Sequence, residues 1–391
     1  MKLLFISYYF EPDLSAGSFK NTALFKELLS QIAENDFIHV ITTQPNRYKS
    51  FQCNVETVER GNNWQIDRIK TPKHSGSFFS QIKSFIVFYI SAFKLVRKQN
   101  YDIVYASSSR LFTAFLGRRI AAKKKIPLYL DIRDIFLENM KEMYTNNKIV
   151  RIPLTFCLKH IEKYTFSKAA HINLVSEGFR ENFKQYTHPT YSFFTNGIDD
   201  IFLNTTPQPT YLSDKKVIVY AGNIGIGQGL EKIIPPAAKE LGNNYLFRVI
   251  GDGGTRHLLE QAIRELNISN VEIIAPQPRE KLIEYYASAD FLFLHLNDLD
   301  AFKKVLPSKI FEYAVFNKPI IAGVAGYAKD FIREKLPDSI IFNPTDVDEF
   351  LRQIKCFTIS DHQHTDFIEQ YSRKNIIKQM ARSIINLYSK I

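Results

Sequence analysis

The chain has 391 residues, of which 45% are hydrophobic and 23% charged, and its formal net charge is +11. This balance is typical of a globular protein with two or three domains, and it excludes collagen-like, repetitive and low-complexity architectures. Its three cysteines, Cys53, Cys157 and Cys356, are far apart and form no CxxC pair. They argue against a disulfide scaffold or a zinc site, and they fit a reducing cytosol.

The positive charge is concentrated in the first half and in the tail. Residues 1–200 have a net charge of +10, residues 201–370 of −4 and residues 371–391 of +5. The densest block, residues 80–125, has ten basic residues and one acidic residue, Asp102. Such a block predicts an anionic membrane surface or a nucleic acid as partner, or simply a solvated basic face.

Aromatic residues within this basic block favour a membrane-interface helix over a groove that tracks phosphates, unless they belong to the core. They are Phe85, Phe88, Tyr89 and Phe93. The longest apolar run is too short to span a bilayer, and no nucleic-acid recognition module is visible. The residues expected to bind an anionic membrane are Lys83, Lys94, Arg97, Lys98, Arg118, Arg119, Lys123, Lys124 and Lys125.

Short apolar strands alternate with longer helical patterns along the chain. In the first half the pattern predicts strands at 3–8, 37–43, 102–106, 127–132, 171–175 and 191–194, with a helix at 18–34. In the second half it predicts strands at 216–222, 245–251, 271–275, 291–296, 319–323 and 339–342. Continuous apolar strands between helices are typical of parallel sheets covered on both faces. The expected fold class is therefore α/β, with two doubly wound domains.

The boundary between the two domains is predicted within residues 193–216, where an Asn-Gly turn signal precedes a cluster of Thr, Pro and Ser. The first domain would span residues 1–200 and the second residues 201–370. The tail, residues 371–391, is an amphipathic helix whose charge matches that of the first domain. We expect it to pack back on that domain.

Ligands of doubly wound sheets bind at the carboxyl ends of the strands, so the loops there hold the candidate sites. In the first domain, Gly17 lies where a loop enters a helix, which predicts an anion pocket or an ordinary capped helix. Asp131, Arg133 and Asp134 crowd together at a later strand end. A carboxylate pair with an arginine can orient a hydroxyl or take a proton, or it can be a self-satisfied ion pair.

In the second domain, several loops converge on one edge of the sheet. The loop that begins at Gly222 contains four glycines, whose N–H groups can line a phosphate. Gly251, Asp252 and Gly253 make a tight turn onto a helix, and Pro276 begins a rigid loop where a flat base can lie. Each loop suits one part of a nucleotide.

The stretch PSKIFEY follows the fourth strand of this domain. A helix is predicted to begin near Pro307, since proline suits the first turn. Lys309 and Glu312 then share one face, and Lys309 lies beside the positive helix end, which suits an anion. Glu312 would accept hydrogen bonds from hydroxyls next to that anion. An exposed ion pair between the two is the alternative.

Together these motifs resemble the family 4 glycosyltransferases of the GT-B type over nearly the whole chain, with two Rossmann-like domains facing a central cleft. The residues that carry the resemblance read YYFEPDLSAGS, LDIRD, SEGF, TNGID, YAGNIG with QGL, VIGDGG, YYASADFLFL and PSKIFEYAVFNKPIIAG. The combination of LDIRD with PSKIFEY is similar to the bacterial group that builds O-antigen and capsule, where N-acetylated amino sugars such as N-acetylfucosamine are proposed donors.

The resemblance implies a retaining transfer of a sugar from a nucleotide sugar, usually UDP-linked, without a metal or other cofactor. It also implies an acceptor saccharide carried on a polyprenyl diphosphate at the cytoplasmic face of the membrane. The protein is accordingly expected to be cytoplasmic and peripheral on the inner face of the membrane. Closure of the two domains would exclude water, which competes as acceptor.

Some positions match the family's motifs and others depart from them. Glu312 matches the second glutamate of an E-x7-E motif that holds the ribose hydroxyls, but the first glutamate falls on Lys304. The arginine and lysine that grip the diphosphate fall on Asn223 and Gln228. Lys309, with the N–H groups around Ser308, is the expected replacement. A common histidine falls near Arg133, and Gly17 matches the glycine that approaches the diphosphate.

These departures leave two alternatives to a sugar transferase open. One is a glycosyltransferase-like subunit that binds a nucleotide or a partner without catalysis, and turnover separates it from an enzyme. The other is a UDP-sugar epimerase of the same fold, which has no use for a basic domain or a lipid-linked acceptor.

Overall fold

The computed structural model describes residues 1–46, 55–72, 78–108, 111–135, 148–203, 215–358 and 364–390. The chain divides into two compact units. Unit 1 comprises Met1–Asn196 with Lys374–Ile391, and unit 2 comprises Gly197–Arg373. Each unit has its own sheet, and each of the predicted strands is observed with its ends shifted by a residue or two. The predicted fold class, α/β with two doubly wound Rossmann-like units, is confirmed.

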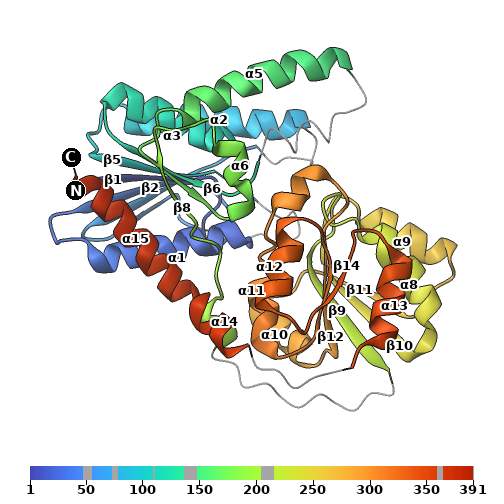
Figure 1. The fold of residues 1–391 in the computed structure, drawn as a ribbon. Helices are drawn as coiled ribbons and strands as arrows, with labels where there is room; N and C mark the ends of the chain where they lie inside the picture. Colours follow the sequence, from blue (N-terminus) through green and yellow to red (C-terminus); the bar gives the residue numbers. More distant parts are fainter. Residues whose placement is uncertain are drawn as a thin grey trace. The chain divides into compact units, whose positions relative to one another are not determined.

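Unit 1 contains an eight-stranded sheet in the order β3-β4-β2-β1-β5-β6-β7-β8. Figure 1 labels β1, β2, β5, β6 and β8 of this sheet. Its strands are β1 Lys2–Ser7, β2 Phe37–Thr43, β3 Val58–Arg60, β4 Trp64–Ile69, β5 Ile103–Ser108, β6 Leu128–Ile132, β7 His171–Leu174 and β8 Thr190–Ser192. The pairs are parallel except β3 with β4, which is antiparallel. These two strands escape the apolar pattern because both contain charged residues.

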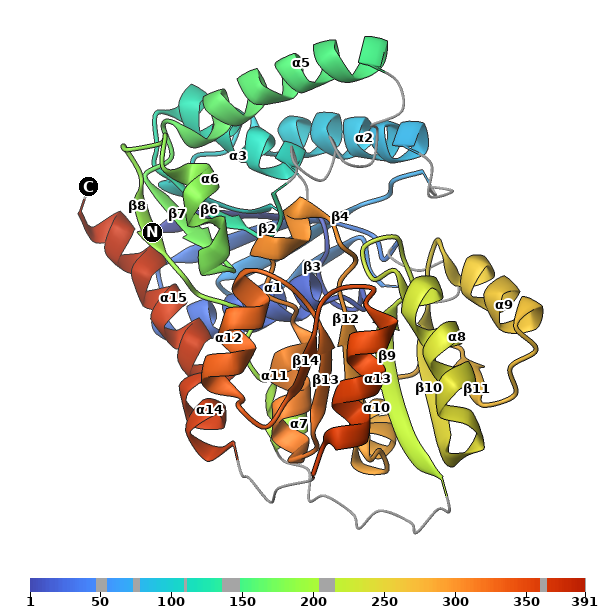
Figure 2. The same cartoon turned by 45° about the vertical axis from the view of Figure 1, so that its right-hand side comes forward.

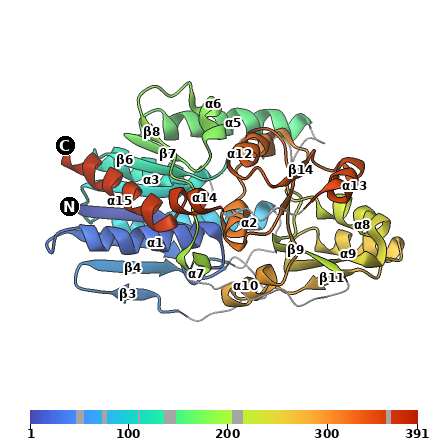
Figure 3. The ribbon, with the colours of Figure 1, turned by 60° about the horizontal axis from the view of Figure 1, so that its bottom comes forward.

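Helices cover both faces of this sheet. They are α1 Ala16–Gln31, α2 Phe78–Val96, α3 Leu111–Lys124, α5 Lys148–Phe166, α6 Arg180–Phe183 and α15 Arg373–Ser389. On one face, Leu24 of α1 and Met380 of the tail helix α15 share a core cluster with Phe5 of β1 (Figure 3). On the other face, α3 contacts β5, and both α2 and α5 contact α3 (Figure 2). The alternation of side chains along β1 serves both cores.

Unit 2 contains a six-stranded parallel sheet in the order β11-β10-β9-β12-β13-β14. Its strands are β9 Lys216–Asn223, β10 Tyr245–Asp252, β11 Val271–Ile274, β12 Phe291–His295, β13 Ile320–Gly323 and β14 Ile340–Phe342. Numbered within the unit, this is the order 3-2-1-4-5-6 of a dinucleotide-binding fold. The order reverses between β9 and β12, so the ligand crevice is expected at their carboxyl ends.

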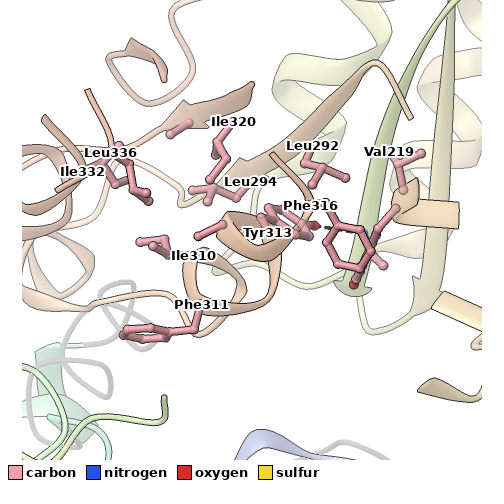
Figure 4. Packing of buried hydrophobic residues seen from close by; sticks show 14 of the residues in the cluster. Val219, Leu292, Leu294, Ile310, Phe311, Tyr313, Phe316, Ile320, Ile332 and Leu336 are labelled. Atoms are coloured by element: carbon pink, nitrogen blue, oxygen red, sulfur yellow. Dashed lines mark hydrogen bonds between the residues drawn. The ribbon is translucent and has the colours of Figure 1, made fainter. Parts of the chain in front are cut away.

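Two apolar cores flank this sheet. The helices of unit 2 are α7 Asp200–Leu203, α8 Leu230–Leu241, α9 Arg256–Glu265, α10 Arg279–Ala287, α11 Lys309–Tyr313, α12 Tyr327–Lys335, α13 Val347–Cys356 and α14 Thr365–Gln370. Val219 of β9 faces the core formed with α11 and α12 (Figure 4). Its neighbours Ile218 and Tyr220 face the core formed with α8 and α13. The site loops therefore rise from a sheet that is buried on both faces.

Candidate functional site

The carboxyl ends of β9 and β12 bring Lys309 and Gly222 together. A Cβ atom added to Gly222 would lie 3.0 Å from Cε of Lys309, so the glycine gives this lysine room to lie across the end of β9. Lys309 Nζ also donates to Glu312 Oε2 at 3.2 Å, and both side chains stay partly exposed. The ion pair that the sequence analysis gave as the alternative is therefore formed, and its lysine lies beside the glycine loop. A cation placed there suits a phosphate.

Glu312 is held by a second residue, whose role no sequence motif indicated. The hydroxyl of Tyr286, on α10, donates to Glu312 Oε2 at 3.2 Å. Burial, followed by the charge of Glu312, raises the pKa of Tyr286 well above its usual range, so the hydroxyl stays protonated. Both of these contacts go to Oε2, and within the described part of the chain no hydrogen bond reaches Oε1. That oxygen remains available to accept from a ligand hydroxyl.

The helix that carries Lys309 differs from the predicted one. It begins at Lys309 rather than at Pro307, and it runs only to Tyr313 before a 3₁₀ turn, Ala314–Phe316. Ser308 precedes it without a side-chain capping bond. One turn aligns few peptide dipoles, so the expected positive helix end contributes little. The ammonium group of Lys309 is the cation of this site.

The two positions where the family has basic residues are paired with each other. Asn223 Nδ2 donates to Gln228 Oε1 at 2.8 Å, across the glycine loop. This neutral bond shapes the loop but supplies no charge. Lys304 ends a short 3₁₀ helix, Asp300–Lys304, between β12 and α11.

The glycines at the end of β10 serve backbone packing. A Cβ atom on Gly251 would overlap the carbonyl oxygen of Gly222, and one on Gly253 would overlap that of Ile224. The Asp252 carboxylate accepts from the neighbouring Gly253 N–H at 2.8 Å. These residues therefore hold two site loops together. Pro276 follows β11, the edge strand, which β10 separates from β9.

In unit 1, the predicted group at the end of β6 is arranged around a buried carboxylate. Asp131 is fully buried and accepts from Lys20 Nζ at 3.1 Å and from Asn173 Nδ2 at 2.6 Å. The hydroxyl of Tyr105 donates to its other oxygen at 3.3 Å. Burial opposes the charge of Asp131, but Lys20 and Arg133 outweigh it and hold the pKa of the carboxyl below its usual range.

The expectation that Asp131 takes a proton or orients an acceptor hydroxyl is therefore revised, since the carboxylate is ionised, enclosed and already bonded. Asp131 instead positions Arg133, whose Nη1 lies 3.4 Å from Oδ2. Arg133 Nη2 also donates to Asn196 Oδ1 at 2.6 Å, and its Nε would lie 3.3 Å from a Cβ on Gly17. Asp134 is exposed. Strand alternation explains why Asp131 and Arg133 share one side and Asp134 does not.

Two of the four aromatic residues of the basic block, Phe85 and Phe88, are part of the core, contrary to the membrane-interface interpretation, whereas Tyr89 and Phe93 are half-buried. Phe88 is fully buried, Phe85 nearly so, and both rings contact Tyr8. The side chains that α2 exposes are aliphatic and basic, at helical spacing: Lys83, Ile86, Ile90, Lys94 and Arg97. The exposed apolar residues of this stripe, Ile86 and Ile90, are ones that the sequence analysis did not single out.

Three of the nine predicted membrane-binding cations have structural partners within unit 1. One of them, Lys123, stays exposed although its Nζ lies 5.1 Å from the ring centroid of Phe93 on α2. The other two are half-buried. Lys124 Nζ donates to the carbonyl of Gln99, just beyond α2. The Arg118 guanidinium lies 5.3 Å from the ring centroid of Tyr164 on α5. The remaining six are exposed: Lys83, Lys94, Arg97, Lys98, Arg119 and Lys125.

Helix α5 adds a second exposed stripe, which the sequence pattern did not indicate. Ile152 is 66% exposed and Phe156 is 65% exposed. Lys159 and Lys163 continue the same helical spacing and are exposed too. No described helix is long and apolar enough to cross a membrane. Over the same residues, no cluster of three or more His, Cys, Asp or Glu side chains is arranged to hold a metal ion.

Comparison with known proteins finds a family model that matches most of unit 2. Residues 205–374 match the family model described as "Glycosyl transferases group 1". A relative from Escherichia coli (strain K12), "Putative colanic acid biosynthesis glycosyl transferase WcaI", is 26% identical over 176 residues. That match spans 44% of this chain and 43% of the relative, which is less than half of either.

Solved structures similar to this chain cover nearly all of it. They include sucrose-phosphate synthase from Thermosynechococcus elongatus, with a TM-score of 0.75, 14% identity and 100% of both chains covered. HepE of Anabaena in complex with UDP and glucose has a TM-score of 0.68 and 14% identity, with 99% of both chains covered. WaaG, a glycosyltransferase involved in lipopolysaccharide biosynthesis, has a TM-score of 0.65 and 13% identity, with 99% of this chain and 98% of its own covered. These similarities establish the GT-B fold.

Proposed function

We propose, from the match of residues 205–374 to the group 1 glycosyl transferases, that this protein is a glycosyltransferase of polysaccharide or lipopolysaccharide biosynthesis. The donor would be a UDP-sugar, with an N-acetylated amino sugar as the transferred group. The acceptor would be a saccharide on a polyprenyl diphosphate, in an O-antigen or capsule pathway. The observation that carries the proposal is Lys309, which lies across Gly222 and is paired with Glu312 at the switch point of the sheet.

Each part of this site has a role in the proposed donor complex. Lys309 would bind the diphosphate and stabilise the negative charge that grows on the leaving UDP. Glu312, held through Oε2, would accept from the ribose hydroxyls through Oε1. The N–H groups of the glycine loop would contact the phosphates. The solved complexes of HepE with UDP and with UDP-glucose support a nucleotide sugar as ligand of this fold.

The proposed transfer retains the configuration of the sugar and needs no covalent nucleophile on the protein. The acceptor oxygen attacks the anomeric carbon on the face from which the diphosphate leaves. The bond from that carbon to the phosphate oxygen breaks, and the acceptor proton passes to the departing oxygen. Arg133, oriented by Asp131 and Asn196, would supply a further positive charge, and Asp134 would orient the acceptor hydroxyl.

Binding of UDP tests the donor site. At a hundredfold excess over its dissociation constant, UDP should stabilise the protein by about 2.7 kcal/mol, which is a shift of a few degrees in Tm. Lys309→Met should weaken UDP binding by about 10-fold or more, because a charge-assisted hydrogen bond to phosphate is lost. Thermal shift and titration calorimetry with UDP, GDP, ADP, CMP and UDP-N-acetylamino sugars measure both effects.

A matched control is available on α10, where Lys281 forms an exposed pair with Glu284 at the same spacing. Lys281→Met should leave UDP binding unchanged. Equal affinity in Lys309→Met and wild type would refute the assigned site. Nucleotide binding without sugar transfer to any lipid-linked acceptor would instead favour a non-catalytic binding subunit.

The membrane part of the proposal rests on the exposed stripes of α2 and α5. Both combine aliphatic or aromatic side chains with lysines, and no acidic residue of these stripes is exposed. Apolar side chains that enter the headgroup region, flanked by cations, are the pattern of an interfacial anchor on an anionic bilayer. The protein would act at the inner face of the cytoplasmic membrane, where a polyprenyl-linked acceptor is presented.

Liposome sedimentation tests this surface. The double variant Ile152→Ser/Phe156→Ser should reduce binding to anionic vesicles about 10-fold or more, since each buried apolar side chain contributes about 1.5–3 kcal/mol. The double variant Lys123→Gln/Lys125→Gln should also weaken binding to anionic vesicles, by about 1 kcal/mol for each charge removed. This effect should be seen only at low salt. Leu258→Ser removes an exposed leucine from unit 2 and should have no effect. Unchanged binding in both double variants would remove the stripes from the proposal.

A further inference from the structure

Three consecutive carbonyl groups of the glycine loop accept hydrogen bonds from the end of β12. The Asn297 side chain donates through Nδ2 to Ile226 O at 2.9 Å, and its backbone N–H donates to Gly227 O at 2.9 Å. His295 donates through Nδ1 to Gln228 O at 2.6 Å. One short strand end thus determines which way three peptide groups of the loop face.

The bond from His295 has a fixed direction, because the other ring nitrogen is also engaged. The backbone N–H of Thr345, in the loop after β14, donates to Nε2 at 3.0 Å. An N–H group can only donate, so Nε2 accepts and Nδ1 carries the proton. Burial, opposed by the bond to Gln228, holds the pKa of His295 at about 4, so the ring is neutral at physiological pH.

Left-handed backbone conformations accompany this arrangement on both sides of the histidine. Thr345 adopts φ 63°, a strained left-handed conformation that is rare for a β-branched residue. Gly229 adopts φ 55°, and a Cβ atom there would lie 2.9 Å from Cγ of Asn297. Strain of this kind persists only where the surrounding contacts determine the conformation, and it concentrates at ligand sites.

The tip of the loop is held by these bonds, whereas Ile224 at its base is buried in a core cluster. Ile226, at its tip, is 55% exposed. A trans peptide group points its C=O and N–H in opposite directions. Because the carbonyl of Ile226 faces Asn297, the N–H of Gly227 faces away from β12. The N–H groups of Gln228 and Gly229 both donate to Gly225 O, at 2.9 and 3.2 Å, which closes the turn.

We infer that His295 and Asn297 are positioning residues that pre-form the loop from Asn223 to Gly229 for the diphosphate of the donor. The inference rests on the proposed function. A loop that already has its bound conformation loses less entropy when the ligand binds, and its dipoles need no reorientation during the reaction. His295 acts through the carbonyl of Gln228 and does not itself contact the nucleotide.

Two near-isosteric replacements of His295 separate positioning from mere stability. In His295→Asn the side-chain amide lies near the position of Nδ1 and keeps the bond to Gln228 O. In His295→Gln the amide oxygen lies near the position of Nε2 and keeps only the bond from Thr345. We expect the Gln variant to bind UDP about 10-fold more weakly and the Asn variant to stay within about threefold of wild type. Titration calorimetry measures affinity, and urea unfolding of each variant measures stability.

Asn297→Asp gives an independent test, because it removes the donor to Ile226 O at nearly constant volume, and it should also weaken UDP binding about 10-fold. His188→Gln, which removes a comparable imidazole–carbonyl bond in unit 1, should leave the affinity unchanged. Wild-type affinity in both His295→Gln and Asn297→Asp, or equal losses in His295→Asn and His295→Gln, would overturn the positioning role. A wild-type protein that binds no nucleoside diphosphate would overturn the proposed function first, and with it the purpose of this arrangement.

Discussion

Replacement of Lys20 by methionine is expected to lower the free energy of unfolding by about 3–5 kcal/mol, which is the cost of breaking a buried ion pair. Lys20 and Asp131 are fully buried, and Lys20 Nζ also donates to the carbonyl of Phe194 at 2.7 Å. Removing the ammonium group leaves the buried carboxylate of Asp131 with one positive partner fewer to offset its lost hydration. Urea unfolding of Lys20→Met and of the wild-type protein measures this difference in the free energy of unfolding.

The control for this prediction is Lys184, which forms an exposed pair with Glu181. Lys184→Met should change stability by less than about 0.5 kcal/mol. The pKa of Asp131 is lowered in the folded protein, so its contribution is present above the unfolded pKa of about 4 and is lost as the pH falls through the folded value. A Lys20→Met protein as stable as wild type at neutral pH would show that the pair adds nothing.

Gly251→Ala is expected to destabilise unit 2 by roughly 3 kcal/mol and to abolish UDP binding. Gly251 has φ 151°, and its added Cβ would overlap the carbonyl oxygen of Gly222 on the neighbouring strand. The carboxyl ends of β9 and β10 would have to separate, which moves Gly222 from beneath Lys309. Thermal unfolding and UDP titration measure the two consequences.

Gly254 provides the matched control in the same turn, because a Cβ there meets nothing within 4 Å. Gly254→Ala should change stability by about 0.5 kcal/mol or less and leave UDP binding intact. If the Gly251→Ala variant binds UDP as tightly as the wild-type protein, the close approach of the carboxyl ends of β9 and β10 is not required for UDP binding.

Much of the fold follows from local pattern. The apolar strands have continuous Val, Ile, Leu and Phe runs because both faces of each sheet are covered, and such runs are visible in any sequence. The loops at strand ends follow from the parallel topology. The pair of Lys309 and Glu312 follows from a spacing of three residues on one helix face. These inferences need only periodicity and spacing, which act over a few residues.

Other features depend on contacts between distant segments. Whether Phe85 and Phe88 face a membrane or the core depends on Tyr8, which lies some 80 residues away in the chain. Asp131 is a plausible acid or base in the sequence, and the burial of Lys20 and Asn173 beside it makes it a fixed anion. The bonds from His295 and Asn297 to the glycine loop join residues about 70 positions apart.

The sequence by itself therefore determined the α/β class, the strands of both sheets other than β3 and β4, and the pair at the start of α11, because hydrophobic periodicity and helical spacing are local. Only the tertiary structure decided which polar groups are buried, which charges are paired within the fold and which apolar residues remain exposed. Those outcomes depend on desolvation and hydrogen bonding between segments that the chain brings together when it folds. Tyr286 is the clearest case, since only the packing of α10 against α11 places its hydroxyl on Glu312.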